Sequence, residues 1–233
     1  SSSTYALGMK TDRMDVWLRS FNSYRAQKQR LKPAQRITTE ANVDPILFST
    51  TNLTGDFIRV GYGDATICLL PLKIGGSNEV GELLTELSST TGTVDGRRSG
   101  TLKEKHKFLF SALYGWFFSD LGTPSWTLNE DVLAIAPNEK ILEVYMSEIG
   151  LGKTWDAMEA FDPLSEALNK ADHLTFATSL KGFTETAFCP SEQWPGLFGN
   201  ALLGGSIEVK NELAFGSLTI QSQKEQAVSS SYL

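Results

Sequence analysis

The sequence predicts an α+β protein, and three observations support that class. Segments with strand-like and helical patterns are intermixed along the chain, without the regular strand–helix alternation of a parallel sheet. The length of 233 residues suits one domain rather than two. Hydrophobic residues make up 41% of the chain, which is enough for a sizeable core. We therefore expect a single compact domain with a mixed antiparallel sheet, packed helices and a basic N-terminal arm.

The basic arm is expected over residues 1–40, where positive charge is concentrated. This segment holds eight basic and three acidic residues, a net charge of +5, whereas the remainder holds 13 basic and 24 acidic residues, a net charge of −11. The basic residues are Lys10, Arg13, Arg19, Arg25, Lys28, Arg30, Lys32 and Arg36. A basic segment on an acidic body is typical of proteins that meet an anionic surface, although a solvated helix face has the same composition.

The arm is expected to contain one helix, followed by a linker. Apolar residues recur at near-helical spacing over residues 12–31, and Pro33 is expected to end that helix. The polar stretch 38–55 is typical of a loop. We therefore expect a linker at 41–55, the globular domain at 56–223 and a polar tail at 224–233.

Within the domain, hydrophobic periodicity and turn residues predict the following elements. Strands are expected at 56–60, 66–74, 132–136, 141–146, 173–179 and 183–188, with a closing hairpin at 205–223. Helices are expected at 76–89, at 103–121 and, in two halves, at 154–161 and 163–171. The composition of residues 90–100 predicts a flexible loop.

The segment 103–121 is the most apolar of the chain. Its apolar residues, Phe108 and Trp116 among them, cover most of the helical circumference. A helix that is apolar on all sides is typical of a protein core. Direct membrane contact is the alternative, since three lysines directly precede the apolar run.

No pattern predicts an enzyme, a metal site or a cofactor. The sequence IGLGKT at 149–154 lacks the first glycine of a phosphate-binding loop, because Ser147 occupies that position. The histidines and cysteines are too scattered to predict a zinc site or a catalytic pair; they are His106, His173, Cys68 and Cys189. Two isolated cysteines, without a signal peptide or a membrane-spanning run, suggest a reducing compartment.

Three local patterns resemble the matrix proteins of rhabdoviruses, particularly the vesiculovirus type. They are the order of strand, helix, loop and apolar helix in 57–121, the segment GTPSWTLNEDVLAIA at 122–136, and the segment ALLGGSIEVKNELAFGSLTIQS at 201–222. That family has a TP dipeptide after its apolar helix, a small apolar patch, and a similar closing hairpin. The chain departs from it in having no PPxY or PTAP motif near the N-terminus and a pI of about 5.1.

The resemblance implies a viral structural protein that coats the inner membrane face, condenses the nucleocapsid and self-associates into a layer. It implies that the eight basic residues of the arm bind anionic lipid and the viral nucleocapsid. We expect self-association through Val132, Leu133, Ala134 and Ile135, although the run VLAIA also suits a buried strand. The implied locations are the virion interior, the host cytoplasm and the inner face of the plasma membrane.

Two alternatives to the matrix-type protein stay open. One is a viral capsid subunit that encloses nucleic acid without binding membranes. The other is a small nucleotide-binding or hydrolytic enzyme. For the matrix-type protein we expect a homo-oligomer with the nucleocapsid and an anionic membrane as partners, and neither a cofactor nor a small-molecule substrate.

Overall fold

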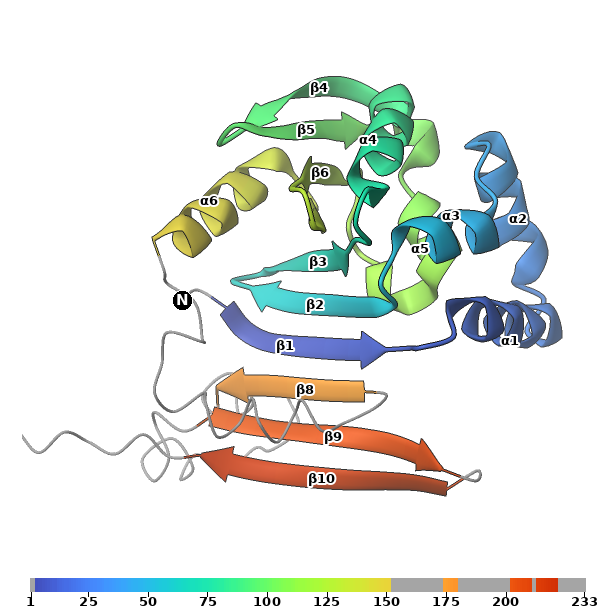
Figure 1. Cartoon of the computed structure of the whole chain (residues 1–233), viewed down its shortest axis with the longest axis vertical. Coiled ribbons are helices and arrows are strands. Elements are labelled where there is room, and N and C mark those ends of the chain that lie inside the picture. The colour runs from blue at the N-terminus through green and yellow to red at the C-terminus, as the bar shows by residue number, and fades with distance from the viewer. Residues whose placement is uncertain (1–2, 152–173, 180–201, 211–212, 222–233) are drawn as a thin grey trace, which may run out of the picture.

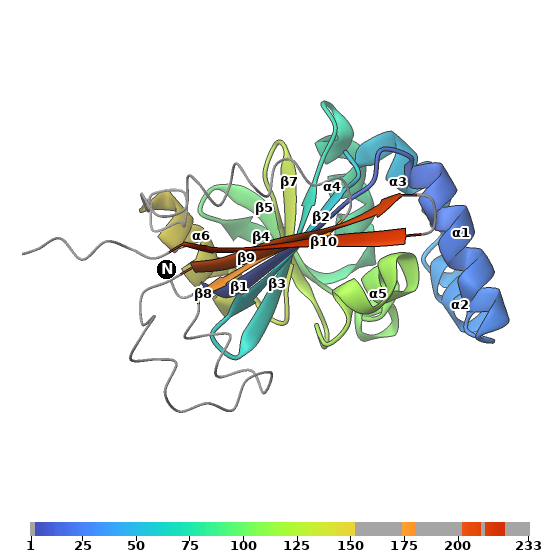
Figure 2. The same ribbon diagram turned by 90° about the horizontal axis from the view of Figure 1, so that it is seen from below.

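The computed structural model describes residues 3–151, 174–179, 202–210 and 213–221. Its centre is one ten-stranded sheet in the order β10-β9-β8-β1-β2-β3-β7-β6-β5-β4, with every neighbouring pair antiparallel (Figure 1). The strands are β1 (Ser3–Lys10), β2 (Asp56–Tyr62), β3 (Ala65–Pro71), β4 (Ser88–Val94), β5 (Arg97–Leu102), β6 (Ser125–Leu128), β7 (Val132–Ala136), β8 (Leu174–Ser179), β9 (Leu202–Lys210) and β10 (Leu213–Gln221). Seen from below, the strands fan out with the twist of an open sheet (Figure 2). The α+β class is confirmed.

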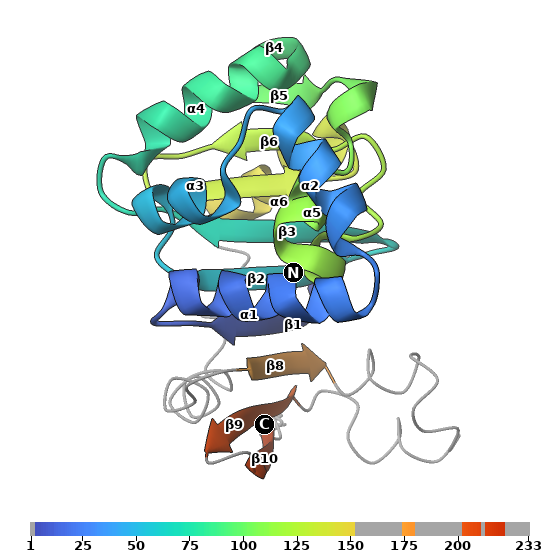
Figure 3. The same cartoon turned by 90° about the vertical axis from the view of Figure 1, so that its right-hand side faces the viewer.

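Helices lie on both sides of the sheet (Figure 3). They are α1 (Met14–Gln27), α2 (Leu31–Glu40), α3 (Pro45–Asn52), α4 (Gly76–Leu87), α5 (Leu109–Tyr114) and α6 (Glu139–Gly150), with the short turns η1 (Glu104–His106) and η2 (Gly115–Phe118). The larger core lies between the sheet and α1, α3, α4 and α5, and the smaller one lies under α6. In β7, Leu133 and Ile135 belong to the larger core and Ala134 and Ala136 to the smaller, because successive strand residues face opposite sides.

Residues 1–40 do not form a separate arm. β1 lies inside the sheet, paired with β2 on one side and with β8 on the other. α1 buries Met14 and Leu18 in the larger core. The expected arm is therefore wrong, because Met14 and Leu18 belong to the same core as the body while most charges of this segment face solvent.

The linker expected after residue 40 is helical in part. α2 continues past Pro33, which lies in its first turn, where a backbone N–H has no intrahelical acceptor. α3 begins at Pro45 with Asp44 as its N-cap, whose carboxylate accepts hydrogen bonds from the N–H of Ile46 at 2.8 Å and from that of the next residue at 2.9 Å. The proline and the polar residues therefore mark helix starts here rather than a loop.

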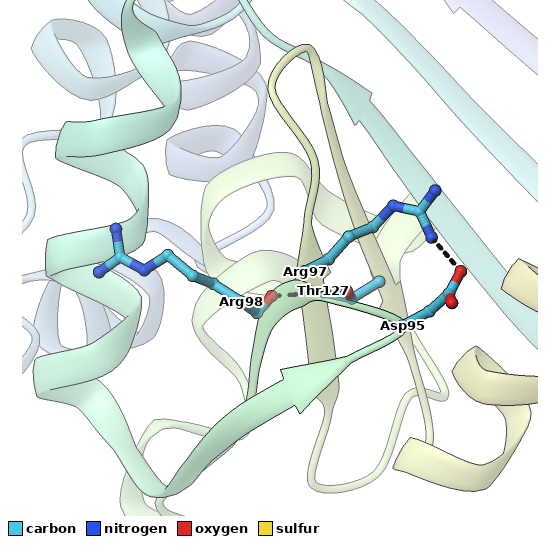
Figure 4. A network of polar contacts seen from close by, with 4 residues as sticks. All are labelled: Asp95, Arg97, Arg98 and Thr127. Atoms are coloured by element: carbon cyan, nitrogen blue, oxygen red, sulfur yellow. Dashed lines mark hydrogen bonds and ion pairs between the residues drawn. The ribbon is translucent and has the colours of Figure 1, made fainter.

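Residues 90–100, expected to be a flexible loop, belong to the β4–β5 hairpin. Asp95 and Gly96 form its turn with positive φ angles of 51° and 74°, the conformation for which Asp-Gly is favoured. Figure 4 shows the two arginines that follow: Arg97 pairs with Asp95 at 2.9 Å, and Arg98 extends the other way, towards α4. The expectation was wrong because a strand pair rich in serine, threonine and glycine has little apolar alternation.

Residues 141–146, expected to be a strand, lie in α6. The side chain of Asn138 caps this helix by accepting a hydrogen bond from the N–H of Ile141 at 3.1 Å. Leu142 and Met146, one helical turn apart, are buried. The short apolar run suited either element, and the four-residue spacing of its buried side chains agrees with the helix.

Residues 103–121 form the short turn η1, the helix α5 and the short turn η2 in succession, rather than one continuous helix. Gly115 ends α5 with a φ of 80°. A Cβ at this position would lie 2.5 Å from the ring of Phe21, so the glycine also allows α1 to approach. Most of the apolar side chains are buried as expected, but Phe108 and Trp116 are exposed.

The run VLAIA forms β7 and not an exposed loop. β7 pairs with β3 on one side and with β6 on the other. Leu133, Ala134 and Ile135 are buried, and Val132 is partly buried. Self-association through these four residues is therefore wrong for this fold, because they are covered by the rest of the protein. The continuous apolar sequence is that of a strand covered on both faces.

The remaining elements agree with expectation where the structure describes them. β2, β3, α4, β8 and the β9–β10 hairpin confirm the elements expected at 56–60, 66–74, 76–89, 173–179 and 205–223. The segments 154–161, 163–171, 183–188 and 224–233 lie outside the described residues. Within the described part of the chain, no helix is long and apolar enough to span a bilayer.

Candidate functional site

The eight basic residues expected to bind lipid and nucleocapsid are distributed over β1, α1, α2 and the turns beside them. All except Arg25 are exposed. Two of the exposed ones are neutralised locally, since Arg13 pairs with Asp15 and Arg36 pairs with Glu40, each at 3.6 Å. The structure therefore does not bring all eight together as one binding surface.

Three of the exposed cations gather at the corner between α1 and α2. The turn places Gln29 in the left-handed region with a φ of 56°, and the N–H of Arg30 donates to the carbonyl of Arg25 at 2.8 Å. This is the hydrogen-bond pattern of a Schellman turn, which ends one helix and redirects the chain. Lys28, Arg30 and Lys32 are exposed there, and none forms an ion pair with a described carboxylate.

A cavity of about 530 Å³ lies between this corner and the α5–η2 segment. Its walls are mostly apolar, with two arginines among them. The residues on which its chemistry depends are Phe21, Tyr24, Arg25, Arg30, Phe108 and Trp116. Cavities of this size, with apolar walls and few polar groups, are typical of small-ligand sites.

Arg25 is a buried cation in the wall of this cavity, only 8% exposed. Its guanidinium donates to the carbonyl of Ala112 at 2.5 Å and to that of Ser111 at 2.9 Å, and it lies 4.0 Å from the centroid of the Phe21 ring. These carbonyls belong to the last turn of α5, and that of Ser111 also accepts a hydrogen bond from the N–H of Gly115. Burial lowers the pKa of Arg25 to about 10, and it forms no ion pair with a described carboxylate.

Three large aromatic side chains surround the cavity and remain in contact with solvent. Tyr24 is 52% exposed, Phe108 is 55% exposed and Trp116 is 64% exposed. The ammonium of Lys28 lies 5.9 Å from the centroid of the Tyr24 ring. We call the set of Tyr24, Lys28, Arg30, Lys32, Phe108 and Trp116 the aromatic–basic rim.

The backbone of η2, which carries Trp116, is held by an arginine from the sheet. Arg59 on β2 donates from Nη1 to the carbonyl of Phe117 at 2.8 Å, with longer contacts to the carbonyls of Trp116 and Ser119. A guanidinium can serve several carbonyls at once because its donors form a planar fork. The ring of Trp116 is therefore presented on a fixed turn rather than on a free loop.

The sequence located the cations of the rim but not its aromatic residues. Phe108 and Trp116 were placed in the core, because a helix that is apolar on all sides is typically buried. Gly115, which ends α5 directly before Trp116, is a local signal at that residue, whereas Phe108 lies at the other end of the helix. Arg25 was expected at the surface, and nothing in the sequence distinguishes it from its exposed neighbours.

The cysteine and the histidine of the described region are both buried. Cys68 is buried, and burial raises the pKa of its thiol to about 12, which leaves it unreactive. His106 is also buried, and its Nδ1 has no hydrogen-bond partner. No group of three metal-binding side chains occurs among the described residues. The IGLGKT segment begins at the end of helix α6 and not after a strand, unlike a phosphate-binding loop.

Comparisons of the chain with protein-family models, curated proteins and solved structures found no match. The resemblance to rhabdovirus matrix proteins therefore stays a prediction. The geometry of the aromatic–basic rim and its cavity carries the functional argument.

Proposed function

We propose that the protein is a non-enzymatic structural protein of the viral matrix type, which binds an anionic membrane surface with the aromatic–basic rim. One observation carries this proposal: three half-exposed aromatic rings surround a cavity beside three cations without an ion pair to a described carboxylate. Tryptophan and tyrosine favour the boundary between water and lipid, because one end of each ring system is apolar and the other is polar. The combination therefore suits a membrane surface better than water alone.

The energetics of the rim are those of reversible binding. A basic residue near an anionic leaflet contributes about 1 kcal/mol, so Lys28, Arg30 and Lys32 together contribute about 3 kcal/mol. Partial burial of the three rings adds an apolar contribution that does not depend on salt. One copy would bind weakly, and an array of copies would bind much more tightly, since linked sites act together.

Assembly into a layer is part of the same proposal and requires a surface other than β7. Strand β4 is the better candidate, because it lies at one end of the described strand order and residues 89–93 are all exposed. Charged residues and proline usually prevent strands at sheet edges from pairing with other chains. β4 has neither between Ser88 and Val94. A contact of β4 with another copy, and the link to a nucleocapsid, are the matrix-type roles that the resemblance implies.

Flotation with vesicles tests membrane binding. Phosphatidylcholine vesicles with about a third phosphatidylserine are compared with pure phosphatidylcholine vesicles, at low and high salt. The rim variant replaces Lys28, Arg30 and Lys32 with glutamate. A control variant with the same change in charge replaces three basic residues outside the rim with glutamate: Lys73, Arg98 and Lys140.

The parent and the control variant are expected to float with the anionic vesicles at low salt and to lose binding as salt rises. The rim variant is expected to stay at the bottom of the gradient. If the rim variant floats like the parent, or the control loses flotation equally, the proposed surface is wrong.

A capsid-type role is the second candidate, and the same rim supports it. Unpaired bases stack on exposed aromatic rings while nearby cations contact the phosphates. Titration with a single-stranded RNA oligonucleotide distinguishes the two. Tight RNA binding that depends on Tyr24, Phe108 and Trp116, without flotation of the parent, would favour the capsid subunit over the matrix protein.

A further inference from the structure

We propose that the cavity under the aromatic–basic rim binds the anionic head and the upper acyl chain of a single membrane phospholipid, held by Arg25 and Arg30. This inference rests on the proposed function, since it names what the membrane-binding surface recognises. It goes further, because it replaces general attraction to negative charge with a specific site for one lipid molecule.

The first argument is the buried charge of Arg25. The two carbonyls that it contacts satisfy donors but carry no net charge. A buried cation is costly unless an anion balances it, and removing water from it without such a partner is costlier than removing water from a neutral group. Because Arg25 lines the cavity and keeps donors beyond those two bonds, an anion in the cavity would supply the missing partner.

The second argument is the position of Arg30. Its backbone N–H is bonded to the carbonyl of Arg25, so the turn keeps the two residues adjacent, and both line the same cavity. A guanidinium matches the two oxygens of a phosphate or a carboxylate with two parallel hydrogen bonds. Two arginines on one cavity therefore indicate an oxyanion rather than a neutral polar group.

The third argument is the apolar remainder of the wall. Phe21, Ala34 and Ile37 line the cavity from α1 and α2, while Phe108 and Trp116 line it from the opposite segment. A small hydrated anion would leave this surface without a partner, whereas an acyl chain would cover it. The anion and the apolar wall together indicate an amphiphile.

The test uses a soluble lipid, so that it does not depend on vesicle binding. Dihexanoyl phosphatidylserine is titrated into the full chain below its micelle concentration and followed by calorimetry. Dihexanoyl phosphatidylcholine, which has no net charge, and inorganic phosphate, which has no chain, are titrated in parallel. Ala34→Phe fills the cavity from α2, and the control Gln35→Phe adds the same ring at an exposed position of the same helix that does not line the cavity.

Saturable binding of one dihexanoyl phosphatidylserine per chain is expected for the parent and for Gln35→Phe. Ala34→Phe is expected to lose it, and Arg30→Gln is expected to weaken it about tenfold, since one charge-assisted hydrogen bond contributes about 1.5 kcal/mol. Because Arg30 is exposed, Arg30→Gln keeps the test decisive even if Ala34→Phe does not fold. Equal binding of the phosphatidylcholine analogue, or unchanged binding by Arg30→Gln, would overturn the proposal.

Flotation of the same variants separates this proposal from the proposed function. Ala34→Phe leaves the rim residues in place, so it is expected to float with anionic vesicles while failing to bind the soluble lipid. Binding of the soluble lipid without flotation of the parent would retain the cavity site and refute the membrane-binding function. Flotation of the parent without binding of the soluble lipid would refute the cavity site alone.

Discussion

Two tryptophans with opposite environments provide the sharpest test of the structure. Trp126 on β6 is 1% exposed, and its Nε1 donates to the hydroxyl of Ser88 at 2.9 Å. Trp116 on η2 is 64% exposed and belongs to the aromatic–basic rim. The substitutions Trp116→Ala and Trp126→Ala remove the same side chain, so any difference between them reports on the environment.

The structure predicts very different losses of stability. Truncating a fully buried tryptophan costs about 3–5 kcal/mol, because the contacts of the side chain are lost and a cavity remains in its place. Trp116 keeps only about a third of its surface away from water. At about 25 cal/mol per Å² for a ring system of up to about 250 Å², its loss costs about 2 kcal/mol at most. For a domain of this size each kcal/mol changes the melting temperature by about 2–4 °C.

Thermal unfolding followed by circular dichroism measures both variants against the parent. Trp126→Ala is expected to melt about 6–20 °C below the parent, and Trp116→Ala at most about 4–8 °C below it. Vesicle flotation is then measured at a temperature below both melting transitions, so that both variants are folded. Under these conditions only Trp116→Ala is expected to lose membrane binding. If Trp116→Ala is as destabilised as Trp126→Ala, Trp116 belongs to the core and the rim is wrong. If Trp116→Ala matches the parent in both assays, its exposure is right but its role in binding is not.

Two further predictions concern the core and the dependence of stability on pH. Leu133→Asp places a charge in β7 between Leu70 and Leu128 and is expected to abolish the cooperative thermal transition. The control Val144→Asp, on the exposed side of α6, is expected to retain that transition. A folded Leu133→Asp chain would contradict the position of β7. Burial, with Lys105 and Lys103 nearby, lowers the pKa of His106 in the folded state. As pH falls below about 6.5, the histidine of the unfolded chain therefore binds a proton before that of the folded chain does, and the folded state loses stability. The melting temperature is therefore expected to fall between neutral and mildly acidic pH. This fall is expected to be smaller in His106→Gln than in the control His173→Gln. An identical fall in both variants would exclude His106 as the cause.

Sequence patterns located the elements whose apolar residues follow a clear period. α4 has apolar residues on one helical face, and the β9–β10 hairpin was expected from two strand-like runs. The patterns failed where tertiary contacts decide. β1 has few features of a central strand, yet it lies between β2 and β8 because both neighbours offer it hydrogen-bond partners. β4 and β5 are polar strands joined by an Asp-Gly turn, and that turn was their only strong local signal.

The candidate site, too, was predictable from local sequence patterns in part and depends on tertiary contacts for the rest. The concentration of cations in the first forty residues is evident from the sequence, because composition does not depend on folding. Which of these residues come together depends on the folded chain. Arg25 is buried because the last carbonyls of α5 lie against it, eighty-seven positions away at Ala112, whereas Trp116 is exposed on η2, directly after the end of α5 at Gly115. Burial depends on the neighbours that the fold brings from distant parts of the chain, and a local pattern contains no information about them.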